Sequence, residues 1–198
     1  MHKLMDAILT AELQGLRERL AKPALDILET GCIRNSAEEY RTGDGWSTLT
    51  FARHVAEHGG SSTSIDLDTS SADQILTREG VRSHAALITG DSVTTLLALA
   101  DQGATYDLVL LDSADDPTLI FNEYRITEPL VRVGGLLMVD DVKLHNDSYG
   151  SKGDAIVPRL KQEGIPFRFD RRWGGGGYID VIMIDKKCHE SGGHTRLE

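Results

Sequence analysis

The sequence predicts an α/β fold, a doubly wound sheet that is mostly parallel with one antiparallel strand near its C-terminal edge. Short apolar runs alternate along the chain with segments of helical spacing, which is typical of a parallel sheet covered by helices. The run 106–112 is apolar on both faces, as a central parallel strand is. The last two expected strands, 166–171 and 178–185, have no helix between them and therefore predict an antiparallel pair.

Each expected helix has an apolar stripe or a start or stop signal. Residues 1–21 carry apolar side chains at helical spacing, and Pro23 ends that segment. The segment 46–58 starts near Ser47 or Thr48, either of which can cap it, and a glycine pair ends it. The expected helices are 1–21, 46–58, 70–79, 93–100, 118–131 with a break near Pro129, and 154–163.

Most of the expected strands are short apolar runs that stop at an acid or a glycine. The first ends in Glu29-Thr30-Gly31, and the fourth ends at Asp112. The glycine run 174–177 joins two strands and opens no helix, so we interpret it as a hairpin end and not as a phosphate loop. The expected strands are 24–31, 62–68, 85–90, 106–112, 136–141, 166–171 and 178–185.

Length and composition indicate a single domain over 1–198. The net charge of −10 disfavours nucleic acid as a partner, because phosphate backbones are bound by clustered Lys and Arg. Cys32 and Cys188 are too few for a disulfide framework and fit a reducing cytoplasm. No apolar run could span a membrane, the N-terminus lacks a signal-peptide core, and the polar tail 186–198 is expected to be flexible.

Two segments have more than one interpretation. The apolar stripe of the N-terminal helix, within 1–22, can pack on the sheet, on a second subunit of a homodimer, or over the substrate as a lid. The stretch 32–45 has no strand alternation and only a weak helical pattern. It predicts a loop or short helix inserted on the ligand side, or else a plain surface excursion.

The end of the first strand organises the expected ligand site, since ligands of open parallel sheets bind at the carboxyl ends of the strands. Glu29 would lie at the mouth of that crevice, and Gly31 would let the backbone approach a ligand closely. Asp66, after the second strand, either accepts hydrogen bonds from a ribose or caps a helix. Asp91 either contacts an adenine amine or caps the helix that follows.

The strand ends, taken in order, resemble those of class I S-adenosylmethionine-dependent methyltransferases, whose fold is Rossmann-like. The resemblance covers about residues 25–185 and implies S-adenosylmethionine as the cofactor. The matching pieces are Glu29-Thr30-Gly31, Asp66, Gly90-Asp91-Ser92, Asp112, Gly134-Gly135 and the terminal strand pair. The residues that it implies for cofactor binding are Glu29, Thr30, Gly31, Ser47, Asp66, Leu67, Gly90, Asp91, Ser92 and Asp112.

Asp112 and the pair Asp140-Asp141 resemble the metal ligands of small O-methyltransferases of the catechol and caffeoyl-CoA type. Those enzymes carry Asp-Asn after the fifth strand, and the Asp-Asp pair is closer to the macrolide-sugar O-methyltransferases. Two carboxylates ~4 Å apart repel by about 4 kcal/mol at an effective dielectric near 20, which a bound Mg²⁺ would offset. The ion would orient a substrate hydroxyl and lower its pKa. Alternatively, some of these acids cap helices or contact only the cofactor.

The sequence departs from that family pattern in two places. Gly31 and Gly45-Trp46-Ser47 resemble two halves of the glycine-rich loop, with 32–44 inserted between them. The catechol-type enzymes also have a lysine base three positions after the first metal ligand, where this chain has Asp115. Lys143 or His145 could replace it, and the pKa of histidine is nearer neutrality.

The sequence therefore predicts a cytoplasmic methyltransferase that uses S-adenosylmethionine and Mg²⁺ to methylate a hydroxyl group of a small molecule. One alternative keeps the cofactor without the metal and has a nitrogen or carboxylate acceptor. Another is a non-catalytic binding protein with this fold. A nicotinamide-dependent oxidoreductase is disfavoured because no intact G-x-G-x-x-G follows the first strand.

Overall fold

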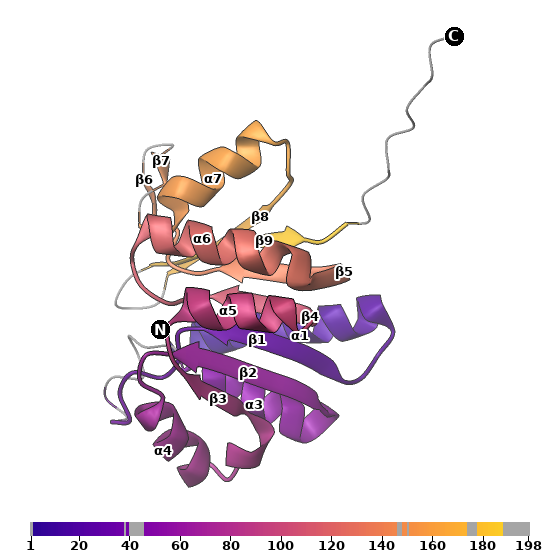
Figure 1. Cartoon of the computed structure of the whole chain (residues 1–198), viewed down its shortest axis with the longest axis vertical. Coiled ribbons are helices and arrows are strands. Elements are labelled where there is room, and N and C mark those ends of the chain that lie inside the picture. The colour runs from indigo at the N-terminus through magenta and orange to yellow at the C-terminus, as the bar shows by residue number, and fades with distance from the viewer. Residues whose placement is uncertain are drawn as a thin grey trace.

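The computed structural model describes residues 2–37, 39, 46–145, 148–149, 151–173 and 178–187. Within these residues, seven strands form the main sheet in the order β3-β2-β1-β4-β5-β9-β8, and β6 and β7 form a separate pair (Figure 1). The strands are β1 (Leu25–Thr30), β2 (Gly60–Asp66), β3 (Ala86–Thr89), β4 (Tyr106–Leu111), β5 (Val131–Val139), β6 (Leu144–His145), β7 (Ser148–Tyr149), β8 (Arg168–Trp173) and β9 (Tyr178–Asp185). The helices are α1 (His2–Leu20), α3 (Ser47–His58), α4 (Ser70–Arg78), α5 (Ser92–Asp101), α6 (Pro117–Thr127) and α7 (Gly153–Gln162), with 3-10 turns η2 (Arg82–His84) and η3 (Glu128–Leu130).

The strand directions confirm the predicted doubly wound sheet. Strands β3, β2, β1, β4 and β5 run parallel, whereas β9 pairs antiparallel with both β5 and β8. The chain moves outward from β1 to β3 and then returns to place β4 on the other side of β1. The carboxyl ends of β1 and β4 therefore form the switch point at which this class of sheet binds ligands.

Helices cover both faces of the sheet (Figure 1). On one face, Ile27 and Leu108 pack against α1 and α3, while on the other Leu28 and Val109 pack against α5, α6 and α7. The apolar stripe of α1 is buried against its own sheet, so of the three interpretations the structure supports packing on the sheet. No helix in the described part of the chain is long and apolar enough to cross a membrane.

Several expected boundaries were wrong for identifiable reasons. Strand β2 begins two residues earlier than expected because Gly60 pairs with Leu25 at the start of β1. Strand β5 begins at Val131, ahead of the glycine pair, and contains a register irregularity there. Helix α6 ends at Thr127, before the predicted break, and the short pair β6–β7 lies where the sequence showed no strand pattern.

The predicted cap of α3 was also wrong. Trp46 precedes the helix in a left-handed conformation with φ 52°, and no side chain caps the helix start. The hydroxyls of Ser47 and Thr48 donate to Glu29 instead. The start of α3 is thereby tied to the end of β1 by side chains, directly behind the switch point.

Gly31 is required by close backbone packing as well as by its conformation. Its φ is +84°, and a Cβ at this position would lie 2.3 Å from the carbonyl oxygen of Asp112. The ends of β1 and β4 approach closely through this residue. The structure thus adds a second reason for glycine here, the close approach of the chain at the end of β4, and the predicted approach of a ligand stays a prediction.

Candidate functional site

A cavity of about 440 Å³ opens at the carboxyl ends of the first four strands. Its walls come from the residues after β1, β2, β3 and β4, together with Asp141 and Lys152 from the far side. The sequence-predicted residues that line it are Gly31, Asp66, Leu67, Gly90, Asp91, Ser92 and Asp112. The others, Glu29, Thr30 and Ser47, lie behind this lining. The rule that ligands bind at strand ends therefore located the cavity. It did not distinguish the residues that line the cavity from those that lie behind the lining.

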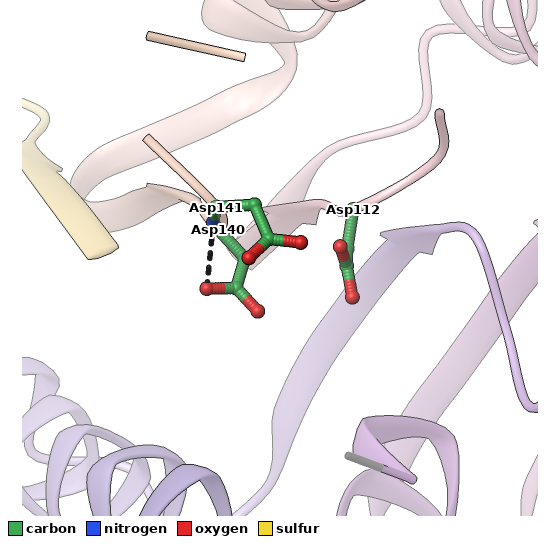
Figure 2. A group of neighbouring side chains, drawn as sticks. All are labelled: Asp112, Asp140 and Asp141. Atoms are coloured by element: carbon green, nitrogen blue, oxygen red, sulfur yellow. Dashed lines mark hydrogen bonds between the residues drawn. The ribbon is translucent and has the colours of Figure 1, made fainter. Parts of the chain in front are cut away.

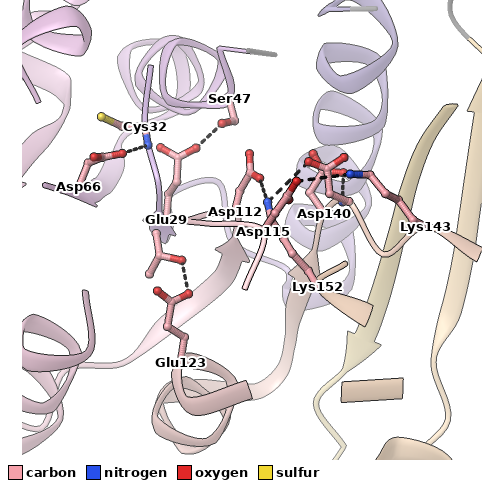
Figure 3. Close-up of polar contacts among 12 residues, drawn as sticks. Glu29, Cys32, Ser47, Asp66, Asp112, Asp115, Glu123, Asp140, Lys143 and Lys152 are labelled. Atoms are coloured by element: carbon pink, nitrogen blue, oxygen red, sulfur yellow. Dashed lines mark hydrogen bonds and ion pairs between the residues drawn. The ribbon is translucent and has the colours of Figure 1, made fainter. Parts of the chain in front are cut away.

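Glu29 does not lie at the mouth of the crevice, which corrects the prediction. Its side chain is 1% exposed, and it accepts hydrogen bonds from Thr48 at 2.7 Å and from Ser64 at 2.8 Å. It also accepts one from Ser47 (Figure 3). Burial raises the pKa of Glu29 to about 7, although the three hydroxyls oppose this shift. Because its partners lie on α3 and β2, Glu29 joins these elements to the end of β1.

We expect Glu29→Gln to remove a pH-dependent part of stability. A carboxyl whose pKa is raised from 4.5 to about 7 stabilises the fold fully below the lower value, and this contribution is lost as the pH rises through the upper one. The loss is about 3 kcal/mol, at 1.36 kcal/mol for each pH unit. Urea unfolding between pH 5 and 8 should show a smaller decline in the free energy of unfolding for Glu29→Gln than for the wild type. The control Glu57→Gln changes an exposed acid on α3 and should follow the wild type; equal slopes in all three proteins would contradict this account.

A second buried acid, Glu123 on α6, was missed by the sequence analysis. It is fully buried, and it accepts hydrogen bonds from Thr30 Oγ1 at 2.8 Å and Ser92 Oγ at 2.5 Å. Burial raises the pKa of Glu123. The hydroxyls of two predicted cofactor residues are thus turned inward, where they fix the end of β1 and the start of α5. The signal that could have revealed Glu123 is an acid on the apolar face of a predicted helix.

Asp66 and Asp91 are held by local hydrogen bonds at the edge of the cavity. The carboxylate of Asp66 accepts from the backbone N–H of Cys32 at 2.9 Å and of Asp68 at 3.1 Å, so it organises the loops after β1 and β2. Helix α4 follows Thr69, and the alternative in which Asp66 caps a helix is wrong. Asp91 does cap its helix, since it accepts from Thr94 N at 2.8 Å. Both side chains also line the cavity.

Three carboxylates converge beside this cavity, as the sequence predicted. Carboxylate oxygens of Asp112, Asp140 and Asp141 lie within 4.8 Å of one another (Figure 2). Burial, followed by the charges of its two neighbours, raises the pKa of Asp140 well above its ordinary value. Asp141 has a φ of 54°, in the left-handed region that Asp tolerates better than most residues, and its N–H donates to Asp140 at 2.8 Å. This conformation directs two consecutive acids to one point.

Lys152 supplies a cation to the acid cluster and was not predicted. Its side chain is 2% exposed, and its Nζ donates to Asp112 and lies 3.7 Å from an oxygen of Asp141 (Figure 3). Burial alone would lower the pKa of Lys152, but the carboxylates of Asp112 and Asp141 raise it above its ordinary value. Lys152 directly precedes α7, forty positions after Asp112, and no spacing in the sequence connects the two.

The two predicted catalytic residues have different surroundings. Lys143 is exposed, has a φ of 37° and pairs with Asp115, Nζ to Oδ2, at 3.4 Å. His145 lies in β6, and its side chain is outside the described residues. Of the two lysines, Lys152 contacts the acid cluster, through Asp112 and Asp141, whereas Lys143 contacts Asp115.

Comparison with known proteins gives a match to one family model and to a set of solved structures. A family model described as a methyltransferase domain matches residues 41–142. No curated protein matches the sequence. The family match begins within the inserted stretch and ends just after the acid pair.

Solved structures share the fold at low identity. A candidate O-methyltransferase from Klebsiella pneumoniae superposes with a TM-score of 0.66 at 19% identity, over 90% of this chain and 80% of the other. An O-methyltransferase from Bacillus cereus in complex with SAH gives 0.59 at 18% identity, covering 89% and 81%. An rRNA methylase from Streptococcus thermophilus gives 0.58 at 12% identity, covering 89% and 94%.

Proposed function

The chain belongs to the methyltransferase family and has the class I fold of enzymes that use S-adenosylmethionine. We propose that it methylates a hydroxyl group of a small molecule. The observation that carries this proposal is the cluster of Asp112, Asp140 and Asp141 beside the cavity at the carboxyl ends of β4 and β5. Methyl transfer to oxygen requires that the acceptor be held and aligned with the methyl group. A convergent set of oxygen ligands can provide this alignment through a bound metal ion.

For S-adenosylmethionine we propose the 440 Å³ cavity. The carboxylates of Asp66 and Asp91 would accept hydrogen bonds from the ribose and the adenine amine, and Leu67, 76% exposed, offers an apolar surface to the base. The cofactor's sulfonium is positively charged, so acidic walls favour it. Glu29 and Glu123 support this cavity from behind.

For Mg²⁺ we propose Asp112, Asp140 and Asp141 as ligands. The donor set fits a hard divalent cation, because all donors are carboxylate oxygens within 4.8 Å of one another. Charge fits as well, since one ammonium, that of Lys152, against three carboxylates leaves two negative charges. When bound, the ion would supply Lewis-acid polarisation of the acceptor hydroxyl.

The reaction forms a bond from the acceptor oxygen to the methyl carbon and breaks the carbon–sulfur bond, whose electrons pass to sulfur. S-adenosylhomocysteine and the hydroxyl proton are released. We assign Lys152, and not Lys143, to a hydrogen bond with the acceptor oxygen, because its Nζ contacts Asp112 on the cavity wall. His145 is our candidate for taking the proton, since a neutral imidazole can do so near pH 7.

We propose a small acceptor in the cytoplasm. The net charge of −10 and the acidic cavity walls disfavour a nucleic-acid phosphate backbone. The similarity to an rRNA methylase is a similarity of fold. A second candidate function is metal-independent transfer to nitrogen or a carboxylate, which is favoured by one observation, the ammonium of Lys152 already placed among the acids.

Calorimetric titration of S-adenosylhomocysteine into the protein, once with Mg²⁺ and once with EDTA, tests the proposal. We expect micromolar binding in both conditions and a change in heat or affinity with Mg²⁺. Product formation from a panel of phenols and sugars should then depend on Mg²⁺. Binding and turnover that are indifferent to EDTA would favour the metal-independent candidate, and absence of binding in both conditions would contradict methyl transfer.

A further inference from the structure

We propose that His54 and His58, one turn apart near the end of α3, bind a divalent metal ion that favours nitrogen ligands, such as Zn²⁺, with Glu57 as a third ligand. These residues line a cavity of about 610 Å³ between α1 and α3. His58 is the last residue of α3, and Gly59 alone separates it from the start of β2. The cavity therefore lies near the amino ends of β1 and β2, at the opposite end of the sheet from the cavity proposed for S-adenosylmethionine.

The spacing of the two histidines places both rings on one face of the helix. Their ring centroids lie 4.7 Å apart, with the ring planes at 64° to each other. Two histidines at this spacing on a helix are the zinc ligands of one class of metalloproteases. Imidazole nitrogen suits zinc, copper and nickel, whereas the carboxylates of Asp112, Asp140 and Asp141 suit magnesium. The two sites would thus select different ions.

Glu57 offers the third ligand from the same helix. Its Oε1 lies 3.7 Å from Nε2 of His58. Two ligand atoms of a tetrahedral zinc ion, each about 2.0–2.1 Å from the metal, are about 3.4 Å apart, so this separation is close to the one that an ion would bridge. The donor atoms of all three residues do not converge within 4.8 Å as those of the acid cluster do. Binding therefore includes a rotation toward His54 of the Glu57 side chain, which is 76% exposed.

The ring of His54 is in a suitable state to bind a metal. Its Nε2 is buried and has no hydrogen-bond partner, and a bound ion would supply one. Burial, followed by the charges of His58 and Arg17, lowers the pKa of His54 to about 4. The ring is therefore neutral near pH 7, which is the form that coordinates a metal ion.

The charges around the cavity are compatible with a cation. The carbonyl groups at the end of a helix carry a partial negative charge, and His58 ends α3. The charged lysine, arginine and acidic residues of the lining are Arg17, Lys22, Glu18 and Glu57. The ammonium of Lys22 pairs with the buried carboxylate of Asp107, outside the cavity lining. Two acids and the end of the helix thus oppose the charge of Arg17.

Titration of Zn²⁺ into the ¹⁵N-labelled full chain tests this site, with excess Mg²⁺ present to occupy the acid cluster. Nitrogen–proton correlation spectra of the imidazole rings report on each histidine separately. We expect the ring signals of His54 and His58 to change together along one binding curve. His58→Asn should weaken this binding by about 100-fold or more, since loss of an outer-shell partner alone costs about 10–100-fold. Glu57→Gln should weaken it by about tenfold, because the amide oxygen is an uncharged ligand.

The control is His84→Asn, which removes a histidine of η2 that does not line this cavity and should leave Zn²⁺ binding at α3 unchanged. Urea unfolding of His58→Asn in EDTA should match the wild type, so that weaker binding reports a lost ligand and not a lost fold. Signal changes confined to His189 and His194, or an unchanged binding curve at His54 in His58→Asn, would overturn the inference. The titration contains neither cofactor nor methyl acceptor, so its outcome is independent of the proposed function.

Discussion

Asp112→Asn should lower turnover by about a thousandfold and abolish the response to Mg²⁺. The substitution keeps the size of the side chain and an oxygen for the Lys152 ammonium, but it removes one negative charge from the cluster. Lewis-acid assistance contributes several kcal/mol, and each 1.36 kcal/mol changes a rate tenfold. The measurement is the rate of S-adenosylhomocysteine formation with an acceptor found in the phenol and sugar panel, over a range of Mg²⁺ concentrations.

Measuring metal binding directly tests the role of Asp112 without a known methyl acceptor. Titration with Mn²⁺, followed by the loss of its free paramagnetic signal, should detect a site in the wild type and a much weaker one in Asp112→Asn. The control is Asp154→Asn, which removes an exposed acid in the first turn of α7, two positions after Lys152. It should bind Mn²⁺ and turn over like the wild type. Full activity and unchanged Mn²⁺ binding in Asp112→Asn would eliminate the metal mechanism.

The fold could be predicted from the sequence because its determinants are local patterns. An apolar run such as 106–112 fits only a central strand, and the alternation of strands and helices leaves few topologies. Errors arose where tertiary pairing overrode local pattern. Gly60 has a low strand propensity, yet it extends β2 because its backbone pairs with Leu25.

The candidate site was predictable to the extent that it follows from strand ends. The rule that ligands bind at these ends placed Asp112, Asp140 and Asp141 together, and the structure confirms their proximity. It could not distinguish a side chain that lines a cavity from one that supports it, because both follow a strand, and for this reason Glu29 was misplaced. Lys152 could not be predicted, since its contact joins residues forty positions apart and no spacing in the sequence connects them.

Lys152→Met should have a large effect on both stability and turnover. The variant leaves the carboxylates of Asp112 and Asp141, whose side chains are 25% and 43% exposed, without their buried ammonium partner. Breaking a fully buried ion pair from one side costs about 3–5 kcal/mol, and the exposure of these two acids places the expected cost at or below the lower end of that range. We expect urea unfolding near pH 7 to show a loss of about that size in EDTA, and a smaller loss with saturating Mg²⁺, because the ion would offset the same negative charge. Turnover should fall by about 100-fold or more at saturating Mg²⁺, because a preorganised donor to the acceptor oxygen is removed.

Lys143→Met is the matched comparison, because it removes the other lysine near the acid pair. Its Nζ forms an exposed pair with Asp115, and exposed pairs contribute about 0–1 kcal/mol. Its free energy of unfolding should therefore be close to that of the wild type, with or without Mg²⁺. The same substitution is therefore expected to lower the free energy of unfolding at Lys152 and to leave it almost unchanged at Lys143. If Lys143→Met lost turnover while Lys152→Met kept it, the acceptor oxygen would contact Lys143, which the sequence analysis named beside His145. Lys152 would then be a structural counter-charge whose loss affects unfolding alone.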